Sequence, residues 1–444
     1  MIVISKEEAG RGMIKPSILP GFIELLPEDQ LIFEKLKEII EENYRNAGFT
    51  PIDTPVLEKK EVLLAKGGGE TEKQVYELSK GKTDMAMRFD LTVPLARYVA
   101  QHYSELSFPF RRYHIAKVYR GERNQKGRYR EFYQCDIDIV GDETLHYSND
   151  AEIVSIIYQV FQDLGLKEIT IHLNHRKILS GFFDFLGIQN HTEVLRSLDK
   201  MDKIGWEEVE KLLEDLDLDQ KQIEELKKFV NIQGSNHEIL AYLSSLAQES
   251  SNYQGAVEEF KEIVDLLKSY GVDEKAIQID TKISRGLDYY TGLVFETTLN
   301  GHEQIGSVCS GGRYDHLAQH YSNKNLPGVG MSIGLSRLFY QLKAENLLNL
   351  DSASAAKVLV LPMEGYLQDG IELVKILRQA GISSFVYSEK PKMKKMFKYA
   401  DSIKVPYVVI LGEEEAKKKE YTLRNMESGK QDLLSQEGLV EFLK

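Results

Sequence analysis

The segment that most constrains the fold is residues 114–141, HIAKVYRGERNQKGRYREFYQCDIDIVG. Its pattern predicts two strands joined by a basic loop, and side chains alternate faces along a strand. The loop carries Arg120, Arg123, Lys126, Arg128 and Arg130. One face of the second strand carries Cys135, Ile137 and Ile139, and the other carries Phe132, Gln134, Asp136 and Asp138.

Two interpretations fit the polar face of this second strand. In the first, the hairpin lies at a sheet edge and water solvates its charges. In the second, the arginines bind phosphate oxygens, the aspartates bind an ammonium group, and Phe132 stacks on a flat base. The segment alone does not choose between them.

The composition indicates a globular protein of more than one domain in a reducing compartment. At 444 residues the chain predicts two or three domains. It has no apolar run long enough to cross a membrane and no signal-peptide pattern at its start, so we expect no membrane partner and a cytoplasmic location. Its two cysteines, Cys135 and Cys309, predict neither a zinc cluster nor a disulfide framework. The net charge of −13 argues against general coating of nucleic acid but allows a locally basic docking surface.

The N-terminal part predicts a helix over residues 29–47 and then an extended segment, FTPIDTPVLE, whose prolines exclude a central strand. These elements are typical of a surface helix with an edge strand, and a dimer interface is the alternative. Residues 84–92, DMAMRFDLT, predict a strand that ends in Asp90 and Thr92. An aspartate at such a place is usually a cap or turn residue.

The remaining chain changes character several times. Residues 175–275 are rich in Glu and Lys at helical spacing and predict a helical insertion. Strand character returns at residues 276–300, and GGRYD at 311–315 predicts a tight turn. A glycine-spaced strand, GVGMSIG, then joins a helix that carries Arg337. After a polar linker at residues 351–356, alternating strands and helices predict a small α/β domain.

Together these motifs resemble those of the class II aminoacyl-tRNA synthetases, and in particular the histidyl-tRNA synthetase family. The helix and strand ending TPVLE, the segment VYRGERNQKGRYREF and the segment GVGMSIGLSRL are similar to the three class II motifs, in order. SRGLDYYTG and SGGRYD resemble the two histidine signatures of the family. NHRKIL, SLDKMDK and RFDLTVPLARYVA resemble the branch that includes eukaryotic-type enzymes.

The resemblance covers nearly the whole chain and implies an α+β fold, in which helices flank an antiparallel β-sheet core of the class II type. It implies a catalytic domain in two parts (1–174 and 276–350), a helical insertion domain (175–275) and a C-terminal α/β anticodon-binding domain (355–444). It also implies a homodimer, because the first motif forms the dimer interface in this family.

The implied activity is ATP-dependent conversion of L-histidine to histidyl-adenylate, followed by transfer to the 3′ end of histidine tRNA. ATP is then a substrate, and we expect Mg²⁺ to bind mainly through its phosphates, without a protein metal site. Two other functions stay open. One is a paralogue that activates histidine for an acceptor other than tRNA, and the other is a regulatory subunit of ATP phosphoribosyltransferase.

The resemblance also assigns roles to residues in these motifs. Arg120 and Arg285 are the expected catalytic residues. The expected ATP-binding residues are Arg120 at the α-phosphate, Glu122 at the adenine amino group, Arg128 near the triphosphate, Phe132 beneath the base and Arg337 at the γ-phosphate. The expected histidine-binding residues are Asp90, Leu91, Thr92, Arg120, Gln134, Asp138, Arg285, Tyr289, Tyr290, Gly311 and Gly312. Arg123 and Lys126 are expected to contact the acceptor stem of tRNA.

Two positions depart from the pattern of the family. Ser336 stands where the third motif usually has a glutamate before its arginine, and His316 stands where GGRYDG ends in glycine. Neither departure removes a residue that is expected to contact a ligand.

Overall fold

The computed structural model describes residues 15–65, 70–122, 127–246, 251–283, 290–348, 354–389 and 392–444. They form two compact units, of which the larger contains the segment 37–347 and the smaller contains residues 348–444 together with 24–36. Within the described ranges, no helix is long and apolar enough to cross a membrane.

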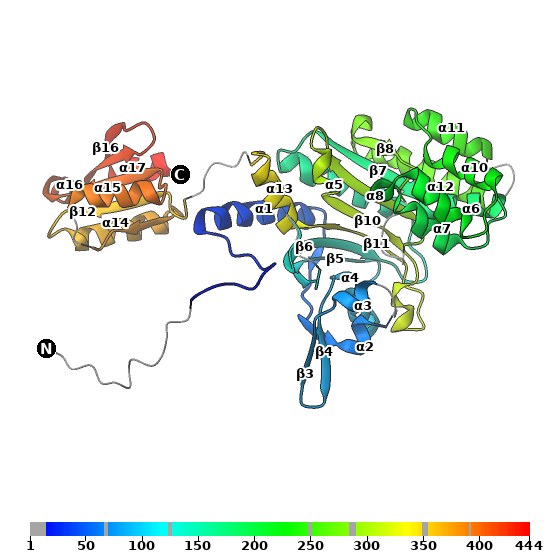
Figure 1. Cartoon of the computed structure of the whole chain (residues 1–444). Helices are drawn as coiled ribbons and strands as arrows, with labels where there is room; N and C mark the ends of the chain where they lie inside the picture. The colour runs from blue at the N-terminus through cyan, green and yellow to red at the C-terminus, as the bar shows by residue number, and fades with distance from the viewer. Residues whose placement is uncertain are drawn as a thin grey trace. The chain divides into compact units, whose positions relative to one another are not determined.

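The larger unit is built on an eight-stranded sheet in the order β1-β5-β6-β11-β10-β9-β7-β8 (Figure 1). All neighbours are antiparallel except the outer pairs β1–β5 and β7–β8. This arrangement confirms the predicted antiparallel core of an α+β fold. The strands are β1 (Thr50–Pro51), β5 (Phe110–Tyr119), β6 (Glu131–Val140), β7 (Ile169–His175), β8 (Ile277–Ile279), β9 (Leu293–Leu299), β10 (Cys309–Tyr314) and β11 (Gly328–Ile333).

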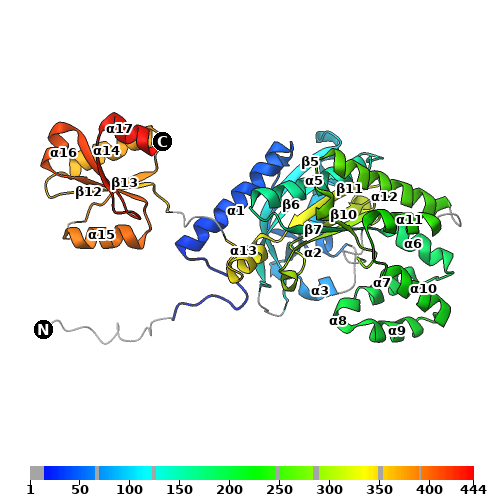
Figure 2. The same ribbon diagram turned by 90° about the horizontal axis from the view of Figure 1, so that it is seen from above.

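Helices bury the apolar face of the central strands. Cys135, Ile137 and Ile139 of β6 are fully buried, as their alternation predicts. The hydroxyl of Tyr44 donates a hydrogen bond to the Cys135 carbonyl at 3.0 Å. Figure 2 shows α5 running along β6, β10 and β11, against which it packs. The helices near this sheet are α1 (Pro27–Asn46), α4 (Thr92–Gln101), α5 (Ser148–Asp163) and α13 (Leu335–Ala344).

A small three-stranded sheet and a group of helices complete this unit. The sheet has the order β2-β4-β3, with β2 (Leu57–Lys59), β3 (Glu77–Lys80) and β4 (Thr83–Met87), and is accompanied by α2 (Lys60–Leu63) and α3 (Glu70–Gln74). Between β7 and β8 lie α6 (Arg176–Phe185), α7 (His191–Leu198), α8 (Met201–Ile204), α9 (Trp206–Glu214), α10 (Gln220–Val230), α11 (Asn236–Leu246) and α12 (Ser251–Ser269). These helices have a core of their own, in which the rings of Phe182 and Phe229 stack at 4.1 Å. The predicted domain boundaries at residues 174/175 and 275/276 remain a prediction.

The structure corrects two local expectations. The strand predicted over residues 84–92 ends at Met87, and Asp90 lies in the turn before α4. The tight turn predicted at 311–315 is wrong, because these residues belong to β10 up to Tyr314. The glycines serve close packing between strands. A Cβ at Gly311 would lie 2.2 Å from the Gly330 carbonyl oxygen, and one at Gly312 would lie 2.6 Å from the Leu293 carbonyl oxygen.

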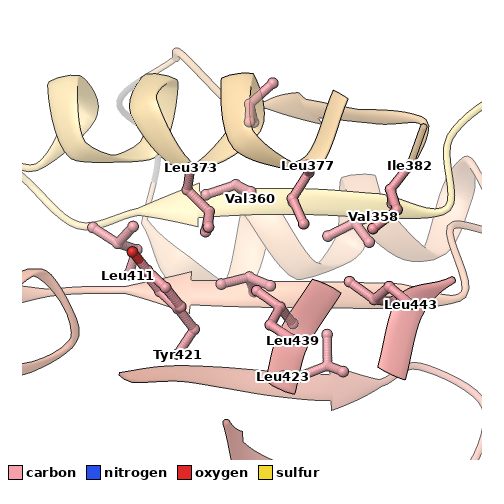
Figure 3. Close-up of a cluster of buried hydrophobic side chains, with 12 residues drawn as sticks. Val358, Val360, Leu373, Leu377, Ile382, Leu411, Tyr421, Leu423, Leu439 and Leu443 are labelled. Carbon is pink, nitrogen blue, oxygen red and sulfur yellow. The ribbon is translucent and has the colours of Figure 1, made fainter. Parts of the chain in front are cut away.

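The smaller unit has a mixed five-stranded sheet in the order β13-β12-β14-β15-β16, in which the first three strands are parallel. Its core is apolar on both faces, as the sequence predicts for an α/β domain. On one face, Val358 and Val360 of β12 pack with residues of α14 and α17 (Figure 3). On the other face, Leu359 and Leu361 pack with residues of α15. The elements are β12 (Val358–Pro362), α14 (Leu367–Gln379), β13 (Ser384–Val386), α15 (Met393–Ser402), β14 (Tyr407–Leu411), α16 (Glu413–Lys418), β15 (Glu420–Asn425), β16 (Gln431–Ser435) and α17 (Gln436–Leu443).

Candidate active site

A cavity of about 310 Å³ lies beside the β5–β6 hairpin, where the N-terminus of α13 faces β6 and the start of β10. Three arginines, a glutamate and two aromatic rings line it. All of the expected ATP-binding residues are there: Arg120, Glu122, Arg128, Phe132 and Arg337. The structure therefore brings together residues that are up to 217 positions apart in the sequence, from Arg120 to Arg337.

A second cavity of about 280 Å³ adjoins the first. Carboxylates and tyrosines line most of it, and Arg120 is its one arginine among the described residues. The expected histidine-binding residues in its lining are Asp90, Thr92, Arg120, Gln134, Asp138, Tyr290 and Gly311. Residues common to both cavities are Arg120, Gln134, Ser310 and Ser332. The two cavities are therefore parts of one site, with a cationic and an anionic compartment.

Four expected residues are not in this lining. Leu91 is fully buried in the turn before α4. Gly312 lies behind the cavity, where a Cβ would approach the ring of Tyr290 to 2.9 Å. Arg285 and Tyr289 lie outside the described residues, as do Arg123 and Lys126.

Arg120 stands at the junction of the two cavities, directly after the last residue of β5. Its Nε donates a hydrogen bond to the Phe89 carbonyl at 3.2 Å. Its guanidinium lies over the rings of Phe89, at 4.4 Å from the centroid, and Phe132, at 5.1 Å. Two aromatic faces thus hold the cation in place. A fixed positive charge therefore lies at the junction, where it can interact with an anionic group in either cavity.

The other cations of the first cavity are also held by neighbours. Arg337 donates from Nη2 to the Ile305 carbonyl at 2.8 Å. Burial, followed by the charge of Arg128, lowers the pKa of Arg337. Arg128 lies 3.7 Å from the carboxylate of Glu122. Two arginines that repel each other across a cavity favour an anionic ligand between them.

Buried carboxylates on the polar face of β6 line the second cavity. Asp138 accepts hydrogen bonds from Arg112 Nη2 at 2.5 Å and from the Tyr314 hydroxyl at 2.7 Å. Asp90 accepts one from the Val93 amide at 3.0 Å, so it caps α4 while lining the cavity. Burial raises the pKa of Asp138 to about 6 and that of Asp136 to about 7, and the charge of Arg112 opposes both shifts. A cationic ligand would relieve this accumulation of buried negative charge.

Glycine on β11 permits this arrangement of carboxylates. Gly330 pairs with Asp138 across the β6–β11 ladder. A Cβ at Gly330 would lie 2.1 Å from Asp138 Oδ1 and would displace the carboxylate. The glycine spacing that the sequence shows in GVGMSIG thus makes room for the site.

Sequence reasoning left several residues of the site out of the expected ligand contacts, although it placed Asp136 on the polar face of the second strand. Asp136, Tyr314, Ser310 and Ser332 line the second cavity, and Arg112 pairs with Asp138 behind it. For Asp136 a signal existed, because strand alternation places it on the polar face with Gln134 and Asp138. For Arg112 no local signal existed, since its partner is 26 residues away and only the register of the hairpin brings them together.

The structure accounts for the two departures from the family pattern. The Ser336 hydroxyl is buried and accepts a hydrogen bond from the Tyr133 amide at 2.9 Å, which ties α13 to β6. His316 is exposed, its ring Nδ1 accepts a hydrogen bond from Gln319 Nε2 at 2.8 Å, and its φ of −122° needs no glycine. Both residues fit without disturbing the cavities.

The described ranges hold no group of three or more His, Cys, Asp or Glu side chains that could bind a metal ion. Among the described residues lining the first cavity, Glu122 carries the only carboxylate.

Comparison with known proteins agrees with this geometry. A family model for histidyl-tRNA synthetase matches residues 21–338. The chain belongs to the histidyl-tRNA synthetase family. A model for an anticodon binding domain matches residues 357–444. The histidine–tRNA ligase of Clostridium tetani is 52% identical over 98% of this chain and 99% of that protein, and that of Finegoldia magna is 49% identical over 97% and 100%.

The fold of the family is also the fold found here. The crystal structure of histidyl-tRNA synthetase from Nostoc sp. PCC 7120 matches with a TM-score of 0.90 at 37% identity, covering 97% of this chain and 99% of that one. The expected resemblance to a branch that includes eukaryotic-type enzymes is not borne out, because these relatives come from bacteria.

Proposed function

We propose that this chain activates L-histidine with ATP to form histidyl-adenylate and then transfers the histidyl group to the 3′ end of histidine tRNA. The observation that carries this proposal is the pair of adjoining cavities, one cationic and one anionic, that share Arg120. Family membership supports it, and so do the relatives named histidine–tRNA ligase that match over nearly their whole length.

The first cavity is suited to ATP. Phe132 offers a ring on which adenine can stack, and Glu122 can accept a hydrogen bond from the adenine amino group. Arg128 and Arg337 supply donors for the β- and γ-phosphate oxygens. Mg²⁺ bound mainly through these phosphates would add positive charge at the same oxygens.

The second cavity is suited to histidine. The α-ammonium group would bind near Asp90, Thr92 and Gln134, and the side chain would extend toward Asp138. Tyr290 and Gly311 would bound the ring, and Leu91 and Gly312 would shape the pocket from behind. Arg285 and Tyr289 keep the roles that the family motif implies, as a catalytic arginine and a residue closing the pocket.

The reaction follows from this placement. A histidine carboxylate oxygen attacks the α-phosphorus, the bond from phosphorus to the β-phosphate oxygen breaks, and pyrophosphate leaves. Two anions must approach each other, so Arg120 between the cavities lowers the barrier by positioning and by fixed charge. The tRNA 3′-terminal hydroxyl then attacks the histidyl carbonyl, and AMP leaves. No enzyme nucleophile is required.

The parts of the chain that contact tRNA are also proposals. We assign binding of the tRNA anticodon to residues 355–444. In this segment Lys394, Lys395 and Lys398 are exposed on α15. We also propose that the chain divides into the catalytic parts 1–174 and 276–350, the insertion 175–275 and the C-terminal domain 355–444. We propose further that it forms a homodimer through the first motif.

The test is histidine-dependent exchange of pyrophosphate into ATP, followed by charging of histidine tRNA. We expect exchange in the wild type and a loss of about 10²–10³-fold in Arg285→Ala, as for removal of a group that stabilises transition-state charge. Arg196→Ala is the matched control, since Arg196 is exposed on α7 and forms a surface ion pair with Glu193.

Pyrophosphate exchange and tRNA charging, together with a binding assay, distinguish the two alternative functions from the proposed one. Exchange without charging would indicate a paralogue with another acceptor. Absence of exchange, together with a tight complex with a phosphoribosyltransferase, would indicate the regulatory subunit and contradict the proposal.

A further inference from the structure

A third cavity, of about 290 Å³, adjoins both compartments of the site and has no assigned role. It shares Ser307 with the first cavity and Glu296 with the second. Formation of the adenylate uses two reactants, ATP and histidine, and the first two cavities account for both. The transfer step needs a third reactant, the 3′ end of the tRNA. The third cavity lies next to the place where that reactant must arrive.

The walls of the third cavity come from the sheet and from the insertion helices. β7 and β9 supply His172, Glu296 and Thr298. The end of α7 and the start of α8 supply a second wall, made of Leu198, Asp199 and Met201. These three residues belong to SLDKMDK, a motif that contributes nothing to the described lining of the first two cavities.

Hydrogen bonds to two parts of the chain fix the loop that follows β8 and completes the cavity. Asn174, which is 1% exposed, donates from Nδ2 to the carbonyl oxygens of Thr281 at 3.2 Å and Ile283 at 2.8 Å. The hydroxyl of Thr281 donates to the Phe229 carbonyl of α10 at 2.7 Å. Asn174 is the first residue of NHRKIL, another motif without a role in the first two cavities. One motif thus lines the third cavity, and the other supports it.

The third cavity is acidic, and its lysine is exposed to solvent. Asp199, Asp280 and Glu296 are partly buried carboxylates, and Lys282 is the one lysine or arginine among the described lining residues. Asp280 Oδ1 accepts the Lys282 amide at 3.0 Å, and Oδ2 lies 3.4 Å from His172 Nδ1. Although burial opposes it, these two neighbours lower the pKa of Asp280. Such a lining repels a triphosphate and suits a ligand with hydroxyl and amino donors inside and one phosphate near the lysine.

The third cavity is also close enough to the reaction for a nucleoside to reach it. Glu296 pairs with Ser310 of β10, which lines both of the first two cavities, and with His172 of β7 on its other side. Neighbouring strands are about 4.8 Å apart, so Glu296 lies about 5 Å from the junction and His172 about 10 Å. A sugar beside Glu296 can therefore place a hydroxyl at the junction while its base extends toward Met201.

We propose that the third cavity binds the 3′-terminal nucleoside of the tRNA. Its carboxylates accept hydrogen bonds from the hydroxyl and amino groups of the nucleoside, and Lys282 meets the 5′-phosphate. Leu198 and Met201 pack against the base. This inference rests on the proposed function and adds a binding site for the acceptor. Because histidine and ATP bind elsewhere, substitutions in the third cavity should slow transfer without slowing activation.

The experiment compares the wild type with Asp280→Asn, Met201→Ala and a control, Lys200→Ala. Lys200 is exposed in the same motif as Met201 and is not among the described lining residues of the three cavities. Pyrophosphate exchange measures activation, and single-turnover transfer from preformed histidyl-adenylate measures the second step. Asp280→Asn and Met201→Ala should keep exchange within about twofold and slow transfer about 10- to 100-fold, as for loss of a hydrogen bond to a charged group or of a contact with a base. Lys200→Ala should change neither rate.

Histidine tRNA that lacks its 3′-terminal nucleoside identifies the ligand of the cavity. In the wild type, this truncation should weaken tRNA binding about 10- to 100-fold. In Asp280→Asn and Met201→Ala it should weaken binding much less, because the variants have already lost the same contacts. A substitution that only distorts the fold would weaken binding of both tRNAs equally and leave their difference intact. That result would overturn the inference, as would transfer at the wild-type rate in both variants.

If neither variant folds, the wild type still decides. A tRNA whose terminal adenine carries a photoreactive azide should crosslink to residues 198–201 or 280–283, and crosslinks confined to other segments would contradict the inference. A wild type that does not charge histidine tRNA overturns the proposed function and the inference with it. A wild type that charges tRNA, with variants that transfer as fast, overturns the inference alone.

Discussion

Two strands of the same sheet each carry a buried arginine paired with an aspartate, and the two pairs differ in how completely they are hydrogen-bonded. Arg313 of β10 donates to Asp150 of α5 from Nε at 3.0 Å and 3.2 Å to the two oxygens, and from Nη2 at 2.5 Å. Arg112 of β5 donates to Asp138 from Nη2 alone, and its Nε and Nη1 are buried without a partner among the described residues. The first pair is closed, and the second is open.

The difference shows what each pair is for. A closed pair satisfies its own charges and fixes α5 against the sheet, so it needs nothing else. The open pair lies beside Asp136, whose Oδ1 also lacks a partner, and both border the second cavity. Unsatisfied polar atoms are rare in protein interiors and concentrate at functional sites. At the second cavity, incomplete hydrogen bonding therefore coincides with the proposed ligand-binding residues.

The largest expected effect comes from breaking the closed pair. Arg313→Met leaves the Asp150 charge buried and unpaired, so the free energy of unfolding should fall by about 3–5 kcal/mol. Urea unfolding followed by circular dichroism and by the fluorescence of Trp206, the one tryptophan of the chain, measures it. Adding Asp150→Leu should recover most of the loss. A loss below about 1 kcal/mol in the single variant would show that the pair is not structural.

Breaking the open pair should affect ligand binding more than folding. Arg112→Met leaves Asp138 with its hydrogen bond from Tyr314, so the loss of stability should be smaller than for Arg313→Met. Histidine affinity should fall about 10- to 100-fold, because the carboxylates lose the charge that keeps them ionised. Calorimetry with histidine and with ATP checks this, and equal weakening of both ligands would contradict it.

The smallest expected effect is a pH dependence of stability that arises in the open cluster. Burial raises the pKa of Asp136 from 3.8 to about 7, so between these values the folded state holds more protons than the unfolded state. Stability should therefore fall as pH rises from about 4 to about 7. Melting curves over this range check it, and Asp136→Asn should flatten the dependence. Groups that face Asp136 are Gln134 and Asp138 on β6, Arg112 and His114 on β5, Ser332 on β11, Glu296 on β9 and Asp90 before α4.

Much of this site could be predicted from the sequence, because its basis is local. Alternation along β6 separates the buried residues Cys135 and Ile137 from the cavity residues Gln134 and Asp138 without knowledge of the fold. The class motifs identify residues of the first cavity in the same way, since Arg120, Glu122, Arg128 and Phe132 occupy one hairpin.

The remainder depends on register between distant segments. Arg112 meets Asp138 only because the hairpin pairs those two positions. Gly311 and Gly312 resemble a turn when considered locally, yet they lie in a strand where neighbouring backbone and the rings of Phe295 and Tyr290 leave no room for a Cβ. Neither fact is encoded in adjacent residues, so the sequence predicted the wrong element at one position and no role at the other.

The most direct test of the account is a crystal structure with a non-hydrolysable analogue of histidyl-adenylate. The account predicts one analogue across both cavities, with adenine on Phe132, the phosphate mimic at Arg120 and the imidazole ring extending toward Asp138. An analogue confined to one cavity, or one whose ring points away from β6, would contradict it.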